Sequence, residues 1–388
     1  MEGFIERWQN MNFSSIPFLG LLQEKISLWM LPSIKRKEIY SLKEKSMFIE
    51  QLNMLSPSPI FYTDQKEKNI VAQITKETHA YNKNNITRTQ AYYEFFTRNQ
   101  EVHWSFLAHI VSRNGGYYMT DLKSSYLKDF LSDSQINRYF LFLERSNAFI
   151  FQDAFPQLLL YEYSKRIGKP LFHLLSAFHV STFMQPFWTE FYLKKNSRGI
   201  TVAMIINEQF MLEERVIKGI YQSTSLLQEL PYKLQENLGF TTIFIPYKLS
   251  KKYRYRISGK TVREFEHVKK RVELGKELYQ ILFEEQYISE TIKFAHNQPH
   301  TGSRSDYWDF LFTKLENANE KLLSPALESV WEDVTHQYTN KVDWFQQKNM
   351  DVLSFFNELP EVTDYDLTVI ALRHYLLYSA LDNISESL

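Results

Sequence analysis

Chain breakers are scarce in this sequence, and their scarcity constrains the fold more than any other feature. No proline occurs between Pro59 and Pro156, and the 388 residues include only 11 glycines and 12 prolines. A strand-rich sandwich needs a turn about every 8–12 residues, which so few breakers cannot supply. The sequence therefore predicts an all-α fold, built as one large multi-helix domain.

Apolar residues recur at helical spacing through most of the chain after residue 66. One interruption is expected near 240–258, where residues 240–246 are rich in β-formers and residues 251–258 alternate, so a short hairpin or extended loop fits. The predicted helices lie near 67–80, 87–98, 100–114, 119–131, 133–152, 155–167, 170–180, 183–194, 200–228, 261–284, 286–296, 305–320, 324–338, 342–357 and 363–380.

The composition suits a large buried core in a reducing compartment. Hydrophobic residues make up 44% of the chain and aromatic residues 16%, whereas disorder needs the opposite balance. The absence of cysteine excludes disulfides and thiolate metal sites. The first residues have no basic region before an apolar run, and the uncharged stretch 170–189 is too polar to span a membrane. We expect a cytoplasmic protein without a transmembrane segment.

Three parts of the chain are distinguished by composition. Residues 1–65 hold four prolines and short apolar bursts, which predicts an N-terminal arm that packs on the main body or on a protein partner. Residues 66–340 form the main helical domain, and residues 341–388 are expected to be C-terminal helices packed on it. Residues 246–276 carry 11 Lys/Arg and 3 Glu. That run could meet an anionic surface, although a solvated strand edge is the commoner role.

The first polar segment of interest is residues 101–121. His103 and His109 are candidate catalytic residues, as a general base or metal ligand, with Asp121 or Glu101 as the carboxylate that would orient them. The alternative is a buried structural histidine beside a solvated stripe. No H-E-x-x-H spacing occurs, so no metal site is predicted. Gly115 and Gly116 are expected to end the helix.

A second candidate is Glu208, which follows an apolar stretch of the helix predicted at 200–228. A carboxylate in such a setting is costly unless it is paired, and burial raises its pKa towards the range useful for proton transfer. Glu208 is therefore a candidate catalytic residue. The alternative is a structural partnership with an arginine.

The third segment, residues 300–308, precedes a predicted helix. Backbone N–H groups of its Gly/Ser loop, together with the guanidinium of Arg304, could bind a phosphate or carboxylate. A capped, salt-bridged helix start is the alternative. The predicted anion-binding residues are Arg113, Asn114, Ser303 and Arg304. P-loop, nucleophile-elbow and dinucleotide-binding spacings are absent.

Several long motifs resemble one family. They are the stretches at 86–89, 103–122, 180–188, 206–209, 214–216, 271–279 and 300–308, of which the second reads HWSFLAHIVSRNGGYYMTDL. Together they resemble an uncharacterised Bacillus-type family known as domain of unknown function 2515, over roughly residues 70–335. The Tyr117–Tyr118 pair departs from the sequence pattern of that family. The resemblance implies a Gram-positive, endospore-forming source and no known activity or cofactor.

Two functions are compatible with these features. In one, the polar groups form an internal network and the chain is a scaffold or regulatory protein that acts through its surfaces; the sequence favours this reading. In the other, the 112–121 and 300–306 loops form an anion-binding cleft of a small-ligand-binding protein or enzyme. The second requires Arg113 and Arg304 to lie on the same side of the fold.

Overall fold

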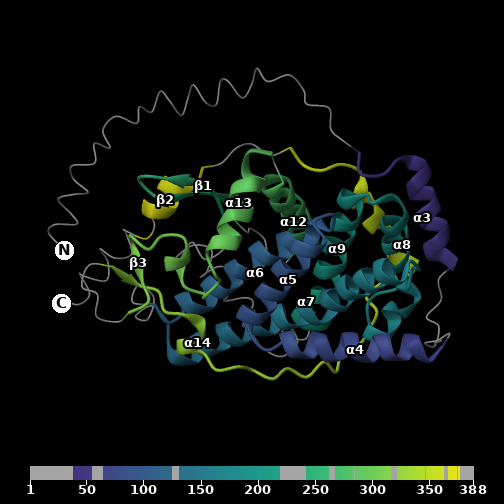
Figure 1. Cartoon of the computed structure of the whole chain (residues 1–388), viewed down its shortest axis with the longest axis horizontal. Helices are drawn as coiled ribbons and strands as arrows, with labels where there is room; N and C mark the ends of the chain where they lie inside the picture. Colours follow the sequence, from purple (N-terminus) through teal and green to yellow (C-terminus); the bar gives the residue numbers. More distant parts are fainter. Residues whose placement is uncertain are drawn as a thin grey trace, which may run out of the picture.

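A computed structural model describes residues 38–54, 64–124, 131–218, 242–261, 267–283, 285–315, 321–345, 347–361, 366–373 and 375. Helices dominate this part of the chain, and two small sheets accompany them. Figure 1 shows the helices gathered around α6, with the β1–β2 hairpin near one end of the molecule and α3 at the other. The predicted all-α fold is confirmed. No helix among the described residues is long and apolar enough to cross a membrane.

The elements follow the chain in a simple order. The α-helices are α3 (Leu42–Met54), α4 (Gln65–Tyr81), α5 (Asn85–Arg98), α6 (His103–Asp121), α7 (Asp133–Ile167), α8 (Met184–Lys194), α9 (Ser197–Leu212), α12 (Val268–Leu282), α13 (Glu285–Asn297) and α14 (Leu327–Val330). The remaining helical turns are η3 (Phe172–Phe178), η4 (Glu213–Ile217), η5 (Arg304–Asp306) and η6 (Gln347–Phe356), and the strands are β1 (Thr242–Ser250), β2 (Arg254–Thr261), β3 (Phe312–Thr313) and β4 (Leu322–Leu323).

Helix α6 is the central element, because it packs against α5, α7, α9, α12, α14 and β1. The prediction that Gly115 and Gly116 end this helix is wrong, since α6 continues to Asp121. A Cβ atom on Gly116 would lie 2.3 Å from the Asn85 side-chain oxygen and 2.6 Å from Nε2 of His300. This glycine therefore allows polar side chains to approach the helix, and does not terminate it.

Helix α7 forms the long floor beneath α6 and merges two predicted helices into one of 35 residues. Ser132 starts it with a capping box to Gln135, and Gly168 ends it in the left-handed conformation. Pro156 lies inside the helix, where it removes one backbone donor. The helix continues through it because buried side chains on both sides, such as Phe155 and Leu158, hold the segment in the core.

The predicted interruption near 240–258 is confirmed as the antiparallel β1–β2 hairpin. Ile245 and Ile257 are fully buried, which explains why this β-prone run pairs locally and packs inwards. Gly259 has a φ of 142°, and a Cβ atom there would lie 1.8 Å from the Ile243 carbonyl oxygen. Only glycine fits that close strand approach. A second hydrophobic cluster lies around the hairpin, beside the main core.

Residues 331–345 adopt neither helix nor strand, although helices were predicted at 324–338 and 342–357. Within the two predicted helices, only the short α14 and the 3-10 turn η6 form, one before and one after residues 331–345. The extended segment is attached to the helices by side chains: the Trp331 indole donates to the Met119 carbonyl at 2.8 Å, and the Trp344 indole donates to Asn207 at 2.9 Å. These tertiary contacts outweigh the local helix propensity. We call residues 331–345 the strap.

Part of the predicted N-terminal arm can be described. Helix α3 lies on α8, where the ring of Phe48 stacks on Phe187 with centroids 4.4 Å apart. The Tyr40 hydroxyl donates to Glu190 at 3.1 Å. Residues 1–37 and 55–63 of the arm, and residues 376–388 of the C-terminal segment, lie outside the described residues.

Candidate functional site

The candidate residues gather at the two ends of α6. We define the C-terminal cluster as Arg113, Asp121, His300, Arg304 and Asp306, and the N-terminal cluster as His103, Trp104, Glu208, Gln209 and Arg271. The first joins the end of α6 to the 298–306 segment, and the second joins the start of α6 to α9 and α12. Three of the motif stretches meet in the N-terminal cluster and two in the C-terminal cluster.

Arg304 and Asp121 form a bidentate ion pair inside the C-terminal cluster. The Arg304 Nε atom lies 2.8 and 2.9 Å from the two Asp121 carboxylate oxygens, and Nη1 donates to the Tyr307 hydroxyl at 2.7 Å. Arg304 is 1% exposed and Asp121 is fully buried. The guanidinium carbon lies 5.3–5.8 Å from the ring centres of Tyr117, Tyr118, Phe244 and Tyr375. The charge of Arg304 is thus matched by a carboxylate and by aromatic faces of the chain itself.

Arg113 also lies on α6, earlier in the helix than Asp121. Its Nη1 donates to the Gln298 carbonyl at 2.7 Å, and its Nε donates to the Tyr117 hydroxyl at 3.1 Å. Its Nη2 lies 3.5 Å from an Asp306 oxygen, and the guanidinium lies 4.5 Å from the centre of the Phe294 ring. Because Tyr117 contacts Arg113 and also faces Arg304, the two arginines lie on the same side of the fold.

Asp306 collects donors from its own loop. The Thr301 backbone N–H and hydroxyl donate to it at 2.9 and 2.6 Å, and Lys314 approaches to 3.6 Å. Although burial alone would raise the pKa of Asp306, the neighbouring His300, Arg113 and Thr301 hold it below its usual value. The Asp306 carboxylate is therefore ionised at neutral pH.

A continuous chain of polar groups crosses from the 300–306 segment to α5. His300 Nε2 bonds to the Asn85 side-chain oxygen at 2.8 Å, and the Asn85 amide donates to the Ser112 carbonyl at 2.9 Å. The hydroxyls of Ser112 and Thr89 lie 2.6 Å apart, and the Thr89 carbonyl accepts from Nδ1 of His109 at 2.9 Å. Every member of this chain is buried.

The two histidines in this series of hydrogen-bonded groups, His300 and His109, are neutral. Burial lowers the pKa of His300 to about 4, and burial followed by repulsion from Arg113 holds the pKa of His109 well below its usual value. A carbonyl can only accept, so the proton of His109 lies on Nδ1. Its Nε2 atom has no hydrogen-bond partner among the residues that the structure describes.

His103 belongs to the other end of α6. Its Nδ1 lies 2.9 Å from the Tyr279 hydroxyl, and its ring stacks on Phe283 with centroids 4.2 Å apart. Burial lowers the pKa of His103 to about 4. The hydrogen bonds of His103 and His109 thus go to a tyrosine and a backbone carbonyl, and neither goes to a carboxylate.

Glu208 is half-buried and receives hydrogen bonds from neutral donors. The Gln209 amide donates to it at 2.7 Å, and the Trp104 indole is its second partner. Burial raises the pKa of Glu208 to about 7, because these bonds and the more distant Arg271 only partly offset the loss of water. Arg271 donates to Gln209 at 2.9 Å and to Glu213 at 2.7 Å. Gln209 therefore links Glu208 to that arginine.

Several buried charged groups were missed from the sequence, and Asp153 is one of them. Asp153 of α7 accepts from Asn207 at 2.6 Å, and Arg215 lies 3.6 Å from its other oxygen. Burial raises the pKa of Asp153 to about 6. Arg215 also donates to the His179 carbonyl at 2.6 Å, from the π-helical turn η4. The only available signal was an aspartate within the aromatic run 149–155. Among the described residues, no group of His, Asp and Glu is arranged to hold a metal ion.

We predict that substitutions of Arg304 and Asp121 are strongly coupled in their effect on the free energy of unfolding. We expect Asp121→Leu and Arg304→Met to lower the free energy of unfolding by about 3–5 kcal/mol each, because each leaves a buried charged group unmatched. The double variant Asp121→Leu/Arg304→Met should lose much less than the sum of the two. Urea denaturation of the four proteins measures this coupling.

A surface pair provides the control. Arg256 is 42% exposed and pairs with Asp366, so Arg256→Gln should cost less than about 1 kcal/mol. Additive losses for the Asp121 and Arg304 variants would contradict the proposed coupling.

The raised pKa of Glu208 predicts that the free energy of unfolding falls as the pH rises. Its pKa rises from 4.5 to about 7 on folding, so the folded protein prefers the protonated form. Its stabilising contribution is complete below about pH 4.5 and is lost as the pH rises through 7. We expect Glu208→Gln to exceed wild type by about 1–3 kcal/mol near pH 8, allowing for partial exposure, and to match it near pH 4.5.

Urea denaturation across this pH range tests the expectation. Glu50→Gln, at an exposed position of α3, is the control and should follow the wild-type pH profile. A constant difference between Glu208→Gln and wild type at all pH values would show that burial does not raise this pKa.

Comparison with known proteins agrees with the resemblance seen in the motifs. The family model described as "Protein of unknown function (DUF2515)" matches residues 80–365. The uncharacterized protein YppC of Bacillus subtilis (strain 168) is 38% identical over 307 residues, which cover 78% of this chain and 92% of that protein. No solved structure matches. The chain therefore belongs to the DUF2515 family, whose function is unknown.

Proposed function

We propose that this protein is a cytoplasmic scaffold or regulatory protein that binds a protein partner through its N-terminal arm. In this proposal the arm comprises residues 1–65 and the main helical domain comprises residues 66–340. Residues 341–388 are C-terminal helices packed on the main domain. The observation that carries the proposal is the surface of α3. One face of this helix is packed on the body, while apolar side chains on its other faces are exposed.

The α3 surface has the character of a docking site. Phe48 and Leu52 are buried against the body, which fixes the position of the helix. Leu42 and Met54 are 80% and 81% exposed, and Leu193 of the adjoining α8 is 72% exposed. Met47 and Ile49 of the same helix are also exposed. Apolar groups gathered on a fixed helix are a common feature of protein interfaces.

The interior supports the same proposal. The arginines predicted to bind an anion are matched by Asp121 and Asp306, so an incoming phosphate would have to displace a buried carboxylate. The basic run at 246–276 is similarly engaged: Arg254 pairs with Asp309, and Arg256 with Asp366. Lys260 pairs with Glu277. These pairs reduce the attraction of that run for an anionic surface.

The proposal predicts that charge on the apolar positions of α3 abolishes partner binding. We expect Leu42→Glu/Met54→Glu to lose a partner that wild type recovers by cross-linking and affinity capture from its source cells. The control Ser46→Glu/Gln51→Glu adds the same charge at exposed polar positions of the same helix and should retain the partner. Binding of the purified partner then gives the loss as a change in Kd. Equal recovery by all three proteins would contradict the role of α3.

A second candidate is the anion-binding cleft, with Arg113, Asn114, Ser303 and Arg304 as binding residues and His103, His109, Asp121 and Glu208 as candidate catalytic residues. One observation favours it: within the described part of the chain, Nη2 of the buried Arg113 has no hydrogen-bond partner, although it lies 3.5 Å from an Asp306 oxygen. A small anion could therefore find one unsatisfied donor there.

Thermal unfolding with inorganic phosphate distinguishes the two candidates. Under the scaffold proposal, phosphate should raise the Tm no more than sodium chloride of equal ionic strength does. A concentration-dependent rise that Arg113→Gln removes, and that the surface variant Arg98→Gln retains, would favour the anion-binding cleft instead.

A further inference from the structure

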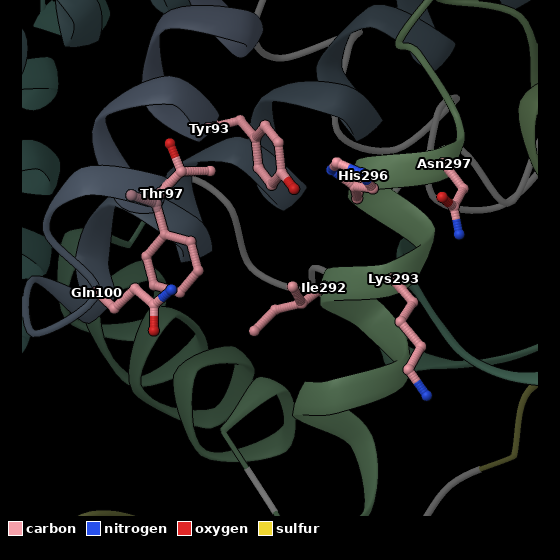
Figure 2. Close-up of a pocket in the computed structure, with 8 residues that line it drawn as sticks. Tyr93, Thr97, Gln100, Ile292, Lys293, His296 and Asn297 are labelled. Atoms are coloured by element: carbon pink, nitrogen blue, oxygen red, sulfur yellow. The ribbon is translucent and has the colours of Figure 1, made fainter.

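A hollow lies between the C-terminal half of α5 and the C-terminal half of α13, away from both α3 and the Arg304–Asp121 pair. Its volume is about 290 Å³. Figure 2 shows Tyr93 on the α5 side of it, with Ile292 and His296 directed towards it from α13. The lining consists of Tyr93, Phe96, Thr97, Gln100, Ile292, Lys293, His296 and Asn297.

The lining combines an apolar floor with polar groups that can donate hydrogen bonds. Phe96 is buried and Ile292 points into the hollow, while the Tyr93 hydroxyl and the His296 ring face each other from opposite walls (Figure 2). Gln100, His296 and Asn297 can donate hydrogen bonds, and no lining residue carries a carboxylate. The lining is therefore suited to an acceptor or an anion, and it disfavours a cation.

Lys293 contributes less than its position suggests. Its amine points away from the hollow in Figure 2 and pairs with Glu290 at 2.6 Å, one turn earlier on α13. His296 is exposed at the rim and projects towards Tyr93. Of the two residues that can carry positive charge, His296 is thus the one placed to meet a ligand.

The walls of the hollow are held by the core. The Tyr93 ring lies 5.1 Å from His109, and Phe96 stacks on Phe106 at 4.7 Å, so the α5 wall rests on α6. The other wall ends at Gln298, whose carbonyl is bound by Arg113. A ligand would meet preformed walls and would not have to order them.

We propose that this hollow binds a small organic anion with one or two fused rings. The rings would lie against Tyr93, Phe96 and Ile292, and the anionic group would lie at His296 with Gln100. The volume is close to the lower end of the range for small-molecule sites, which starts at about 300 Å³, and is too small for a folded peptide segment. The inference goes beyond the proposed scaffold function, because it concerns a different surface and a different class of ligand.

Three probes of one shape and different charge test the proposal: 2-naphthoate, 2-naphthamide and 2-naphthylmethylammonium. Titration calorimetry with the full chain should give a Kd for naphthoate at least about tenfold lower than for the ammonium, with the amide between them. Equal affinities for all three, or binding of none, would overturn the proposal.

Matched variants locate the binding. Thr97→Trp fills the hollow, and Thr75→Trp is its control, because both threonines are exposed and each hydroxyl donates to a backbone carbonyl at 2.8 Å. Thr97→Trp should weaken binding of naphthoate and naphthamide about tenfold or more, and Thr75→Trp should leave both unchanged. Gln100→Trp, outside the helix, replaces Thr97→Trp if that variant does not fold. Equal effects of the pocket and control variants would overturn the location.

His296→Leu should remove the preference for naphthoate over naphthamide while the amide still binds, and Lys293→Leu should keep the preference. The reverse result would overturn the assignment of His296. The α3 variant Leu42→Glu/Met54→Glu should bind naphthoate as wild type does, so failure of the pocket and failure of the scaffold proposal are separate outcomes.

Discussion

Burial of the Arg304 guanidinium against Asp121 is the constraint on which the arrangement of this end of the molecule depends. Removing both charges from water costs several kcal/mol per ion, and only good geometry with further hydrogen bonds offsets that cost. The Tyr307 hydroxyl accepts from the Arg304 guanidinium, and the Ser324 hydroxyl accepts from the Arg304 backbone N–H, so both residues must lie close to Arg304. The 298–306 segment is held on α6 as a result.

The hairpin depends on the same helix. The Asn114 side chain exchanges two hydrogen bonds with the backbone of Phe244, its amide donating at 2.9 Å and its oxygen accepting at 2.8 Å. The Tyr118 hydroxyl donates to the Thr242 carbonyl. A displacement of α6 would thus break the contacts of the hairpin and of the 298–306 segment together. Similar buried pairs join other distant segments: Arg88 with Glu144, and Arg215 with Asp153. Pairs of this kind oppose sliding of one helix along another, because a shift of one turn separates the charges.

The helices and the hairpin were predictable because their causes are local. The β-prone run at 240–258 and the helical periodicity of α4, α8 and α13 survive folding with small changes of boundary. The strap was not predictable, since its conformation depends on contacts such as those of Trp331 and Trp344 with helices far away in sequence. Gly116 shows the same limit: a glycine that terminates helices in isolation here makes room for Asn85 and His300. The motifs identified the polar residues, but which of them form pairs depends on the fold.

The distribution of paired and unpaired groups argues for function at the periphery. Most buried charges have a partner within the chain, and the histidines of the interior are neutral at physiological pH. A neutral His109 behind the wall of the hollow adds no charge that would repel a ligand, and it supports Tyr93 and Phe106 by stacking. The core, with its buried polar pairs, therefore supports two surfaces of different character: a helix with exposed apolar side chains and a small donor-lined hollow. Because the two share no residue, a ligand in the hollow could affect a partner at α3 only through the helices between them. Buried hydrogen bonds and ion pairs join those helices, so a ligand would shift them together more readily than it would shift one helix alone.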